Sequence, residues 1–311
     1  MNVQHLQIMS TRGLPVQLIR MGPVDVHVSA SGGKYPDGNY AVVRGADSSA
    51  SFDMPLACCE LPASALGRDM VLLSHVHEDH TAGLSLLPDA RVFVHAGDAM
   101  AMQSIDGLAK HYGYRPEITK ALCQRAVEDF HYVARPDAVA FEDGSVWDLG
   151  GGVRVRALHA PGHTSGHCVL MIEPHGIAFI GDIDLTGFGP YYGDATSNLA
   201  AFRRTLAFVR EIDAACWITS HHRGVITDRG FFLSHLEKFG AVLQRRDDAL
   251  LTRLRERPAT LDELVAQRFV YPRHFDDLYV EDAERRMIGQ HLEALQMQGR
   301  VEVDGAVWSL A

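Results

Sequence analysis

Four side chains that can bind a metal ion lie within six residues of the sequence: His75, His77, Asp79 and His80. The apolar run Val71–Ser74 precedes them and predicts a buried strand. His75 and His77 are two residues apart, so at the end of an extended strand they point to the same side. Asp79 and His80 are adjacent and cannot both follow that direction. The simplest geometry is a chain that turns after His77 and directs the two pairs to two nearby metal ions. A mixed set of imidazoles and carboxylates without thiolates is typical of a catalytic metal site.

Three more apolar runs lead directly into side chains of the same kinds. Each run predicts a strand, and each is followed by His or Asp residues: Val153–Leu158 by His159, His163 and His167; Ala178–Ile180 by Asp182 and Asp184; Cys216–Thr219 by His221 and His222. Loops that follow strands of one sheet are a usual place for catalytic groups. The sequence therefore predicts one site assembled at one edge of a sheet.

This combination of motifs resembles the metallo-β-lactamase superfamily of metallo-hydrolases over about residues 15–235. The resemblance implies an α/β (α+β) fold, a four-layer αββα sandwich that forms a metal-binding catalytic domain over residues 1–238. The superfamily usually carries Asp-Thr-Gly or Asp-Pro-Gly after an early strand. Asp53-Met54-Pro55 stands in that place here, so the glycine is missing and the shape of this loop is not predicted.

The resemblance also implies the metal ligands. The first metal would be held by His75, His77 and His163, the second by Asp79, His80 and His221, and Asp182 would bridge the two. His221 is preferred to its neighbour His222, because the matching histidine of the superfamily follows a small residue directly after the strand. His159 and His167 are expected to support the ligands or to be structural, since a ligand imidazole needs its second ring nitrogen fixed by a neighbour. Asp184 either does the same or is a turn residue.

The implied chemistry is hydrolysis by a hydroxide that bridges two divalent metal ions. Zn²⁺ is the expected metal, with Fe or Mn as alternatives, and Asp79 is expected to orient the hydroxide and to accept its proton. The block Pro161–His167 resembles that of glyoxalase-II-like thioesterases and of lactonases, so a small thioester or lactone/ester substrate is expected. One alternative is a phosphodiesterase or endoribonuclease. A further alternative is a mononuclear iron persulfide dioxygenase, which the presence of all seven ligand positions disfavours.

The chain changes character after about residue 240. A charged amphipathic helix is expected over Val242–Arg255, a capping box at Thr260–Glu263, a helix over 282–298 and a hairpin at Asp304-Gly305. These elements predict a small winged-helix-like domain over residues 239–311. Winged helices often bind nucleic acid, but residues 241–311 carry 10 Arg and no Lys against 13 Asp and Glu. A role in packing or in a homodimer is therefore expected instead.

Two segments without metal ligands are expected to lie near the site. Residues 97–135 predict a helical insertion, which either packs on the core or walls the substrate pocket. The loop 187–194 directly follows the Asp182 motif, so Tyr191 or Tyr192 could reach the pocket.

The composition is that of an ordinary globular protein, with 311 residues, 47% hydrophobic residues, 22% charged residues and a net charge of −10. No run is long and apolar enough for a membrane span, and residues 1–20 do not resemble a secretory signal. The five cysteines are scattered, which predicts a reducing cytoplasm rather than a disulfide framework. A small-molecule substrate is the expected partner, and no membrane contact is expected.

Overall fold

Two mixed β-sheets form the centre of the protein, whose computed structural model describes residues 2–29 and 31–311. The eight strands of the first sheet follow chain order: β1 (Val3–Met9), β2 (Pro15–Met21), β3 (Val24–Val28), β4 (Tyr40–Arg44), β5 (Ser49–Phe52), β6 (Met70–Leu72), β7 (Arg91–His95) and β8 (Val139–Phe141). The second sheet has the order β14 (Val225–Ile226), β13 (Cys216–Ile218), β12 (Ile177–Phe179), β11 (Cys168–Glu173), β10 (Arg154–His159) and β9 (Val146–Asp148).

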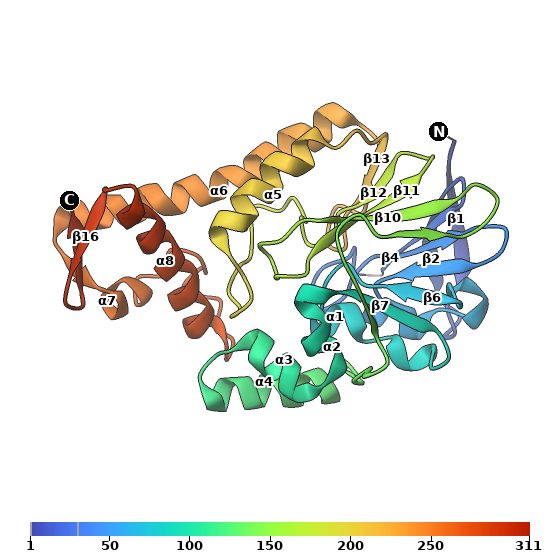
Figure 1. Ribbon diagram of the computed structural model, residues 1–311, viewed down its shortest axis with the longest axis horizontal. Helices are drawn as coiled ribbons and strands as arrows, with labels where there is room; N and C mark the ends of the chain where they lie inside the picture. Colours follow the sequence, from blue (N-terminus) through green and yellow to red (C-terminus); the bar gives the residue numbers. More distant parts are fainter. Residues whose placement is uncertain (1, 30) are drawn as a thin grey trace.

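Helices cover the outer faces of both sheets. On the side of the first sheet lie α1 (Glu78–Thr81), α2 (Ala99–Gln103), α3 (Ile105–Tyr112) and α4 (Pro116–Glu128), and on the side of the second lie α5 (Leu199–Glu211) and α6 (Arg229–Glu256). Short 3-10 helices, η1 (Leu56–Glu60), η2 (Ala63–Ala65), η3 (Leu84–Leu86) and η4 (Ala96–Asp98), lie in the connections. The layer order is therefore αββα, as the resemblance implied (Figure 1).

The two sheets pack face to face over an apolar core. In β10, Val155 and Ala157 point into this core, whereas Arg156 points outward and its Nε donates to Glu173 Oε1 at 2.9 Å. Phe52 of β5 and Phe179 of β12 meet across the core with ring centroids 5.6 Å apart. This alternation of apolar and polar residues is why the β10 sequence forms a strand with one face against the other sheet.

The strands that carry the predicted site residues direct them to one edge of the sandwich. β6 is parallel to its neighbours β5 and β7, and β12 is parallel to β13. The carboxyl ends of parallel neighbours open at the same edge, which is where open α/β sheets commonly bind ligands. The expected strands at residues 71–74, 153–158, 178–180 and 216–219 are all present, with bounds shifted by at most two residues.

Helix α6 is longer than the sequence predicted. The expected helix was Val242–Arg255 with a domain boundary between residues 238 and 239, but α6 begins at Arg229 and runs without a break to Glu256. The turns of α6 before Val242 have the same helical spacing of apolar residues as the turns after it, with Phe232, Leu236 and Phe239 buried. The predicted boundary therefore lies inside a helix, and the two parts of the chain share α6 rather than a linker.

The C-terminal part contains the elements that were expected. After α6 follow β15 (Ala259–Thr260), α7 (Leu261–Val265), α8 (Val280–Met297), β16 (Val301–Asp304) and β17 (Val307–Leu310), and the three strands form a sheet of order β15-β17-β16. Thr260 and Glu263 form the predicted capping box. The hairpin pairs Asp304 with Val307, so its two-residue turn lies one residue later than expected. The winged-helix assignment itself stays a prediction.

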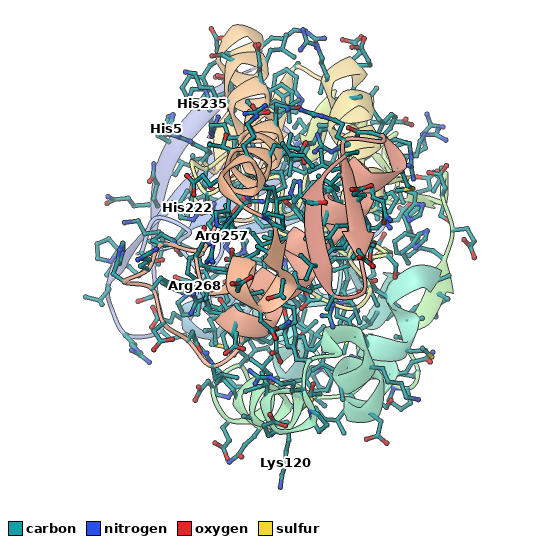
Figure 2. The ribbon with its side chains drawn as sticks, turned by 90° about the vertical axis from the view of Figure 1, so that its left-hand side faces the viewer. His5, Lys120, His222, His235, Arg257 and Arg268 are labelled. Carbon is teal, nitrogen blue, oxygen red and sulfur yellow. The ribbon has the colours of Figure 1, made fainter. Side chains whose placement is uncertain are left out.

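The C-terminal part lies at one end of the molecule, beyond the free ends of α3 and α4 (Figure 1). Seen from that end, the C-terminal part faces the viewer, and Arg257 and Arg268 lie on this face (Figure 2). Within the described ranges no helix combines the length and the apolar character that crossing a membrane would require.

Candidate metal centre

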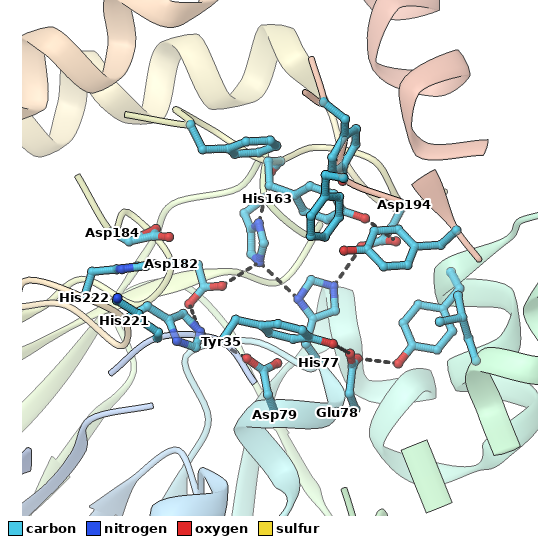
Figure 3. Close-up of a pocket in the computed structure, with 18 of the residues that line it drawn as sticks. Tyr35, His77, Glu78, Asp79, His163, Asp182, Asp184, Asp194, His221 and His222 are labelled. Carbon is cyan, nitrogen blue, oxygen red and sulfur yellow. Dashed lines mark hydrogen bonds and ion pairs between the residues drawn. The ribbon is translucent and has the colours of Figure 1, made fainter. Parts of the chain in front are cut away.

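The seven predicted ligand residues lie together at one edge of the sandwich. His75 and His77 lie in the segment after β6, and Asp79 and His80 in the short helix α1 that follows. The other three come from the ends of later strands: His163 between β10 and β11, Asp182 after β12, and His221 after β13. All seven are buried or nearly so, and Figure 3 shows His77, His163 and Asp182 pointing toward one another.

Three imidazoles form the first group of ligand atoms. His77 Nδ1 lies 3.1 Å from His75 Nε2 and 3.1 Å from His163 Nε2, and the last two atoms are 3.2 Å apart. Tetrahedral coordination at about 2.0–2.1 Å places ligand nitrogens about 3.3 Å from one another. The three nitrogens therefore have the mutual spacing of ligands around one metal ion.

In each of these rings the inner nitrogen faces the other two rings and the outer nitrogen faces away from them. The hydrogen bonds of the outer nitrogen show, for two of the rings, which nitrogen carries a proton. His77 Nε2 donates to the Asp194 carboxylate at 2.8 Å, and His163 Nδ1 donates to the carbonyl oxygen of Tyr191 at 3.0 Å. Carboxylates and carbonyl oxygens only accept, so each ring keeps its proton on the outer nitrogen. The inner nitrogens then carry lone pairs that face each other, an arrangement that a cation between them would stabilise.

Asp53 fixes one ring in each of two ligand groups. Its Oδ2 accepts from the Ser74 hydroxyl at 2.8 Å and from His80 Nδ1 at 2.9 Å. Because the Ser74 hydroxyl already donates to Asp53, it accepts from His75 Nδ1 at 3.0 Å. In both His75 and His80, Nε2 is therefore the nitrogen left to bind a cation. Asp53 itself has a φ of 53°, in the left-handed region, and Pro55, which stands where the usual motif has glycine, is extended with a φ of −68°.

The second group consists of two imidazoles and one carboxylate. His221 Nε2 lies 3.3 Å from His80 Nε2 and 3.1 Å from Asp79 Oδ2. His221 Nδ1 donates to the carbonyl oxygens of Gly33 and Asp37 at 3.1 and 2.9 Å, so Nε2 is the nitrogen left to bind a cation. The neighbouring His222 is exposed and belongs to none of the ligand groups found among the described residues.

The two oxygens of Asp182 face different groups. Oδ2 lies 3.3 Å from His163 Nε2 in the first group, and Oδ1 lies 3.1 Å from His80 Nε2 in the second. Oδ1 is also buried without a hydrogen-bond partner among the described residues. A carboxylate in this position can bridge two cations, so the donor set fits two divalent ions.

Asp182 is held in place by His167 and by the glycine before it. The backbone N–H of Asp182 donates to His167 Nε2 at 3.2 Å, and His167 Nδ1 donates to the Ala160 carbonyl at 3.0 Å. Burial lowers the pKa of His167 to about 3, so this ring is neutral and can accept. Gly181 has a φ of 53°, and a Cβ there would lie 2.5 Å from His167 Nε2. His167 thus supports the ligands, as expected.

Asp98 connects two ligand loops and was not predicted. Its Oδ2 accepts from the backbone N–H of Val76 at 3.1 Å and from the Thr164 hydroxyl at 2.6 Å. Its Oδ1 accepts from the backbone N–H of Gly166 at 2.7 Å. Asp98 therefore fixes the His75–His77 segment against the loop that carries His163. Asp194 was missed in the same way, although it lies in the loop 187–194 that was expected near the pocket.

A comparison with protein families matches residues 69–221 to the Metallo-beta-lactamase superfamily. The matched range contains all seven candidate ligands. The chain contains a metallo-beta-lactamase superfamily domain.

Curated relatives of the domain come from fungi. An atrochrysone carboxyl ACP thioesterase of Pseudocercospora fijiensis is 26% identical over 242 residues, which are 74% of this chain and 60% of that protein. A lactamase-like protein of Pestalotiopsis fici is 32% identical over 123 residues, 39% of this chain and 29% of the relative. This chain therefore spans less than two thirds of the length of either relative.

Two solved structures resemble nearly the whole chain. A metallo-beta-lactamase family protein of Thermus thermophilus superposes with a TM-score of 0.64 at 23% identity, covering 99% of this chain and 98% of the other. A beta-lactamase domain protein of Burkholderia ambifaria also gives 0.64, at 18% identity, covering 95% and 92%. At these identities the likeness extends the shared fold beyond the metallo-beta-lactamase domain into the C-terminal part.

A cavity of about 470 Å³ opens over the ligand groups of the metallo-beta-lactamase domain. Aromatic rings make up much of its wall: Tyr35, Tyr112, Tyr114, Phe188, Tyr191, Tyr271, Phe275 and Tyr279. The insertion of residues 97–135 thus does form part of the pocket wall, through Tyr112 and Tyr114. Of the two candidate tyrosines in the loop 187–194, Tyr191 lines the cavity. Tyr192 does not line it, and its hydroxyl is hydrogen-bonded to Nε2 of His291 at 2.6 Å.

Two carboxylates, the half-buried Glu78 and the buried Asp194, each hold a pair of tyrosine hydroxyls at this cavity. Glu78 accepts from Tyr35 at 3.1 Å and from Tyr112 at 2.5 Å. Asp194 accepts from Tyr114 at 2.7 Å, besides its bond from His77, and lies 3.3 Å from the Tyr191 hydroxyl. The tyrosine rings around the metallo-beta-lactamase site are therefore fixed through their hydroxyl groups.

The electrostatic setting of the site is strongly acidic. Burial would raise the pKa of Asp194, but hydrogen bonds from His77 and Tyr114 lower it to about 2. Burial and the nearby Asp182 carboxylate raise the pKa of Asp184 to about 7. Burial lowers the pKa of His221, but the carboxylates of Asp182 and Asp79 raise it to about 10 when no cation is bound. Such a cluster of carboxylates is stabilised by cations, which agrees with the ligand geometry of the metallo-beta-lactamase domain.

Proposed function

We propose that this protein is a metal-dependent hydrolase that cleaves a small thioester or a related lactone or ester. One observation carries the proposal: five imidazole lone pairs and the carboxylates of Asp79 and Asp182 converge on two points at the floor of an apolar cavity. Two metal-binding positions beneath an apolar cavity suit the attack of water on a carbonyl group. The thioesterase name of the Pseudocercospora fijiensis relative supports a thioester as the first substrate class to test.

The ligands divide into two sets. The first ion would be held by His75, His77 and His163, the second by Asp79, His80 and His221, with Asp182 between them. Imidazole and carboxylate donors without thiolates suit Zn²⁺, and Fe and Mn remain alternatives. When bound, divalent ions supply Lewis acidity, which polarises a carbonyl oxygen and makes water acidic enough to attack near neutral pH.

The side chains around the ligands supply orientation and proton transfer. Asp79 borders the cavity and approaches His221 at 3.1 Å, so it can orient an attacking water molecule and accept its proton. Asp53 and Asp194 keep the ligand imidazoles in one tautomer. The aromatic wall excludes bulk water, which strengthens every electrostatic interaction at the reacting carbonyl.

The phosphodiesterase or endoribonuclease alternative receives less support. Lys34 is the one Lys or Arg residue among the residues that line the cavity, against five carboxylates: Glu78, Asp79, Asp182, Asp184 and Asp194. Two arginines of the C-terminal part, Arg246 and Arg253, are buried. A polyanionic backbone would meet mostly negative charge here. We infer from the element order that the C-terminal part is a winged-helix-like domain used for packing. The second ligand set speaks against a mononuclear dioxygenase.

Metal analysis and a substrate panel test the proposed function. Protein purified without added metal should contain about two divalent ions per chain, and removing them with a chelator should abolish hydrolysis of thioesters. Asp79→Asn should lower kcat at least about 100-fold while the circular dichroism spectrum is unchanged. Asp89→Asn, at an exposed position outside the site, is the matched control and should leave kcat unchanged. Full activity after complete metal removal would overturn the proposal.

A further inference from the structure

Six aromatic rings form one end of the cavity, and they come from three distant parts of the chain. We name this end the aromatic chamber: Tyr112, Tyr114, Tyr191, Tyr271, Phe275 and Tyr279. The first two lie at the end of α3 and just after it, the third lies in the loop after Asp182, and the last three precede α8 in the C-terminal part. The C-terminal part thus supplies half of these rings, and the candidate ligands His77, His163 and His221 line the same cavity.

The tyrosines on the catalytic side present ring carbons rather than hydroxyl donors. The Tyr112 hydroxyl donates to Glu78, and the Tyr114 hydroxyl donates to Asp194. The Tyr191 hydroxyl lies 2.7 Å from the Tyr114 hydroxyl. With these hydroxyls occupied by protein partners, the chamber offers a ligand chiefly apolar ring faces and edges.

The segment that carries the C-terminal rings is fixed by a buried carboxylate. Glu284 of α8 is fully buried and accepts from three consecutive backbone N–H groups: Phe269 at 2.6 Å, Val270 at 3.0 Å and Tyr271 at 3.0 Å. Farther along, Asp277 bonds Arg125 of α4 at 2.9 Å. This segment is therefore held at both ends, and its rings are in place before a ligand binds.

Helix α8 also forms hydrogen bonds to the segments that carry Tyr112, Tyr114 and Tyr191 on the opposite wall of the chamber. Arg286 donates to the carbonyl oxygens of Tyr112 at 2.9 Å and of Gly193 at 2.8 Å, and its guanidinium lies 5.1 Å from the centre of the Tyr114 ring. Asp282 accepts from Arg115 Nε at 2.7 Å. A pocket whose walls are joined in this way loses little conformational entropy on binding.

The shape of the chamber suits a planar ring system. Tyr112 and Tyr114 lie within 4° of parallel, and Tyr271 and Phe275 within 13°. Aromatic groups bind well among rings that offer both faces and edges. None of the six chamber residues carries a positive charge, while Glu78 and Asp194 lie directly behind the rings. An acyl group with its own negative charge would therefore be disfavoured.

We propose that the aromatic chamber binds a planar aromatic acyl group, so that the C-terminal segment 269–279 determines which thioester is hydrolysed. The inference rests on the proposed function, because it places the acyl carbon above the metal ligands. Water adds to that carbon, the carbon–sulfur bond breaks, and the thiol leaves with a proton. The carboxylic acid product keeps the aromatic group that occupied the chamber.

Two model thioesters test this selectivity: S-(2-naphthoyl)-N-acetylcysteamine and S-acetyl-N-acetylcysteamine. The metal-loaded protein should show a kcat/KM at least about 100-fold higher for the naphthoyl thioester. Phe275→Ala should lower the ratio of the two kcat/KM values about tenfold, because one ring contact is lost. Phe275 is 41% exposed, so the fold should tolerate its removal. Phe231→Ala is the matched control, since Phe231 is 42% exposed on α6 and lies outside the cavity; it should leave the ratio unchanged.

The outcomes separate the two proposals. If neither thioester is hydrolysed by protein with both metals, the proposed function fails. If both are hydrolysed with similar kcat/KM, or if Phe275→Ala leaves the ratio unchanged, the aromatic chamber is not the acyl site and the inference fails.

A binding measurement tests the chamber without turnover. Calorimetry with 2-naphthamide, a neutral and unreactive probe, should detect binding to the wild-type protein. Phe275→Ala should weaken it about tenfold, and Phe231→Ala should not change it. Equal binding by Phe275→Ala and the wild-type protein would overturn the inference even if thioesters are hydrolysed.

Discussion

The Asp194 carboxylate accepts a hydrogen bond from Nε2 of His77 at 2.8 Å, although 117 residues separate the two in the chain. The same carboxylate accepts from Tyr114, so one buried group orients both a candidate metal ligand and a ring of the pocket wall. Ligand imidazoles depend on such partners, which fix the tautomer and increase the basicity of the ligand nitrogen.

Asp194→Ala should therefore weaken metal binding about 10- to 100-fold, while the remaining ligands still bind. A titration with a chromogenic chelator of known affinity measures this change. Asp194→Asn should have a smaller effect, because its amide oxygen can still accept from His77. Equal metal affinity in the alanine variant and the wild-type protein would contradict a supporting role for Asp194.

His221 and His222 should differ sharply when each is replaced by alanine. His221 Nε2 faces His80 Nε2 at 3.3 Å, whereas His222 is exposed outside the ligand groups. His221→Ala should reduce the metal content from about two ions to about one per chain, because the second set loses one of its three own ligands. His222→Ala should keep both ions. Elemental analysis after dialysis decides between them, and the reverse result would reassign the last ligand.

The ligand residues could be predicted from the sequence because each follows an apolar run that ends at the same sheet edge. Periodicity fixes such strands locally, and the closely spaced His75, His77, Asp79 and His80 need no knowledge of distant contacts. These local signals predicted one metal site at one sheet edge. The fold, the division of the seven ligands and the preference for His221 over His222 came from the resemblance to the metallo-β-lactamase superfamily.

The residues that support the ligands could not be predicted in this way. Asp98 and Asp194 are single carboxylates whose partners lie far away in the chain, so only the packed structure reveals them. The same holds for Glu284, whose three acceptor bonds bring the C-terminal rings to the pocket. The predicted boundary at residue 238 rested on a change in charge pattern, and it falls inside α6, whose apolar face continues across it.

Arg246 should be important for stability, although it lies in a sequence of charged residues. It is 3% exposed and donates to the carbonyl oxygens of Pro190 and Phe188, each at 2.8 Å. Arg246→Met should lower the free energy of unfolding by about 3 kcal/mol, since buried acceptors lose their donor. Arg245→Met, at the exposed neighbouring position, should change it by no more than about 0.5 kcal/mol. Urea unfolding of both variants measures the difference. Equal changes in the free energy of unfolding would show that Arg246 does not stabilise the loop 187–194.

His27 should make the protein less stable in acid. This side chain of β3 is 2% exposed and stacks on Tyr40, and neither ring nitrogen has a hydrogen-bond partner among the described residues. Burial lowers its pKa from 6.5 to about 4 in the folded protein. Between pH 6.5 and pH 4 the unfolded chain therefore binds a proton that the folded protein does not, so stability falls as the pH is lowered through this range.

His27→Phe should remove this contribution, because phenylalanine keeps the ring stacked on Tyr40 but does not titrate. From the size of the pKa shift, the wild-type protein should lose about 3 kcal/mol more than the variant between pH 7 and pH 4. Urea unfolding at several pH values measures both curves. His5→Phe serves as the control, since His5 is exposed on β1 and its replacement should leave the wild-type pH dependence intact. If the two proteins showed the same dependence of stability on pH, the pKa of His27 would be the same in the folded and the unfolded chain, which would contradict this prediction.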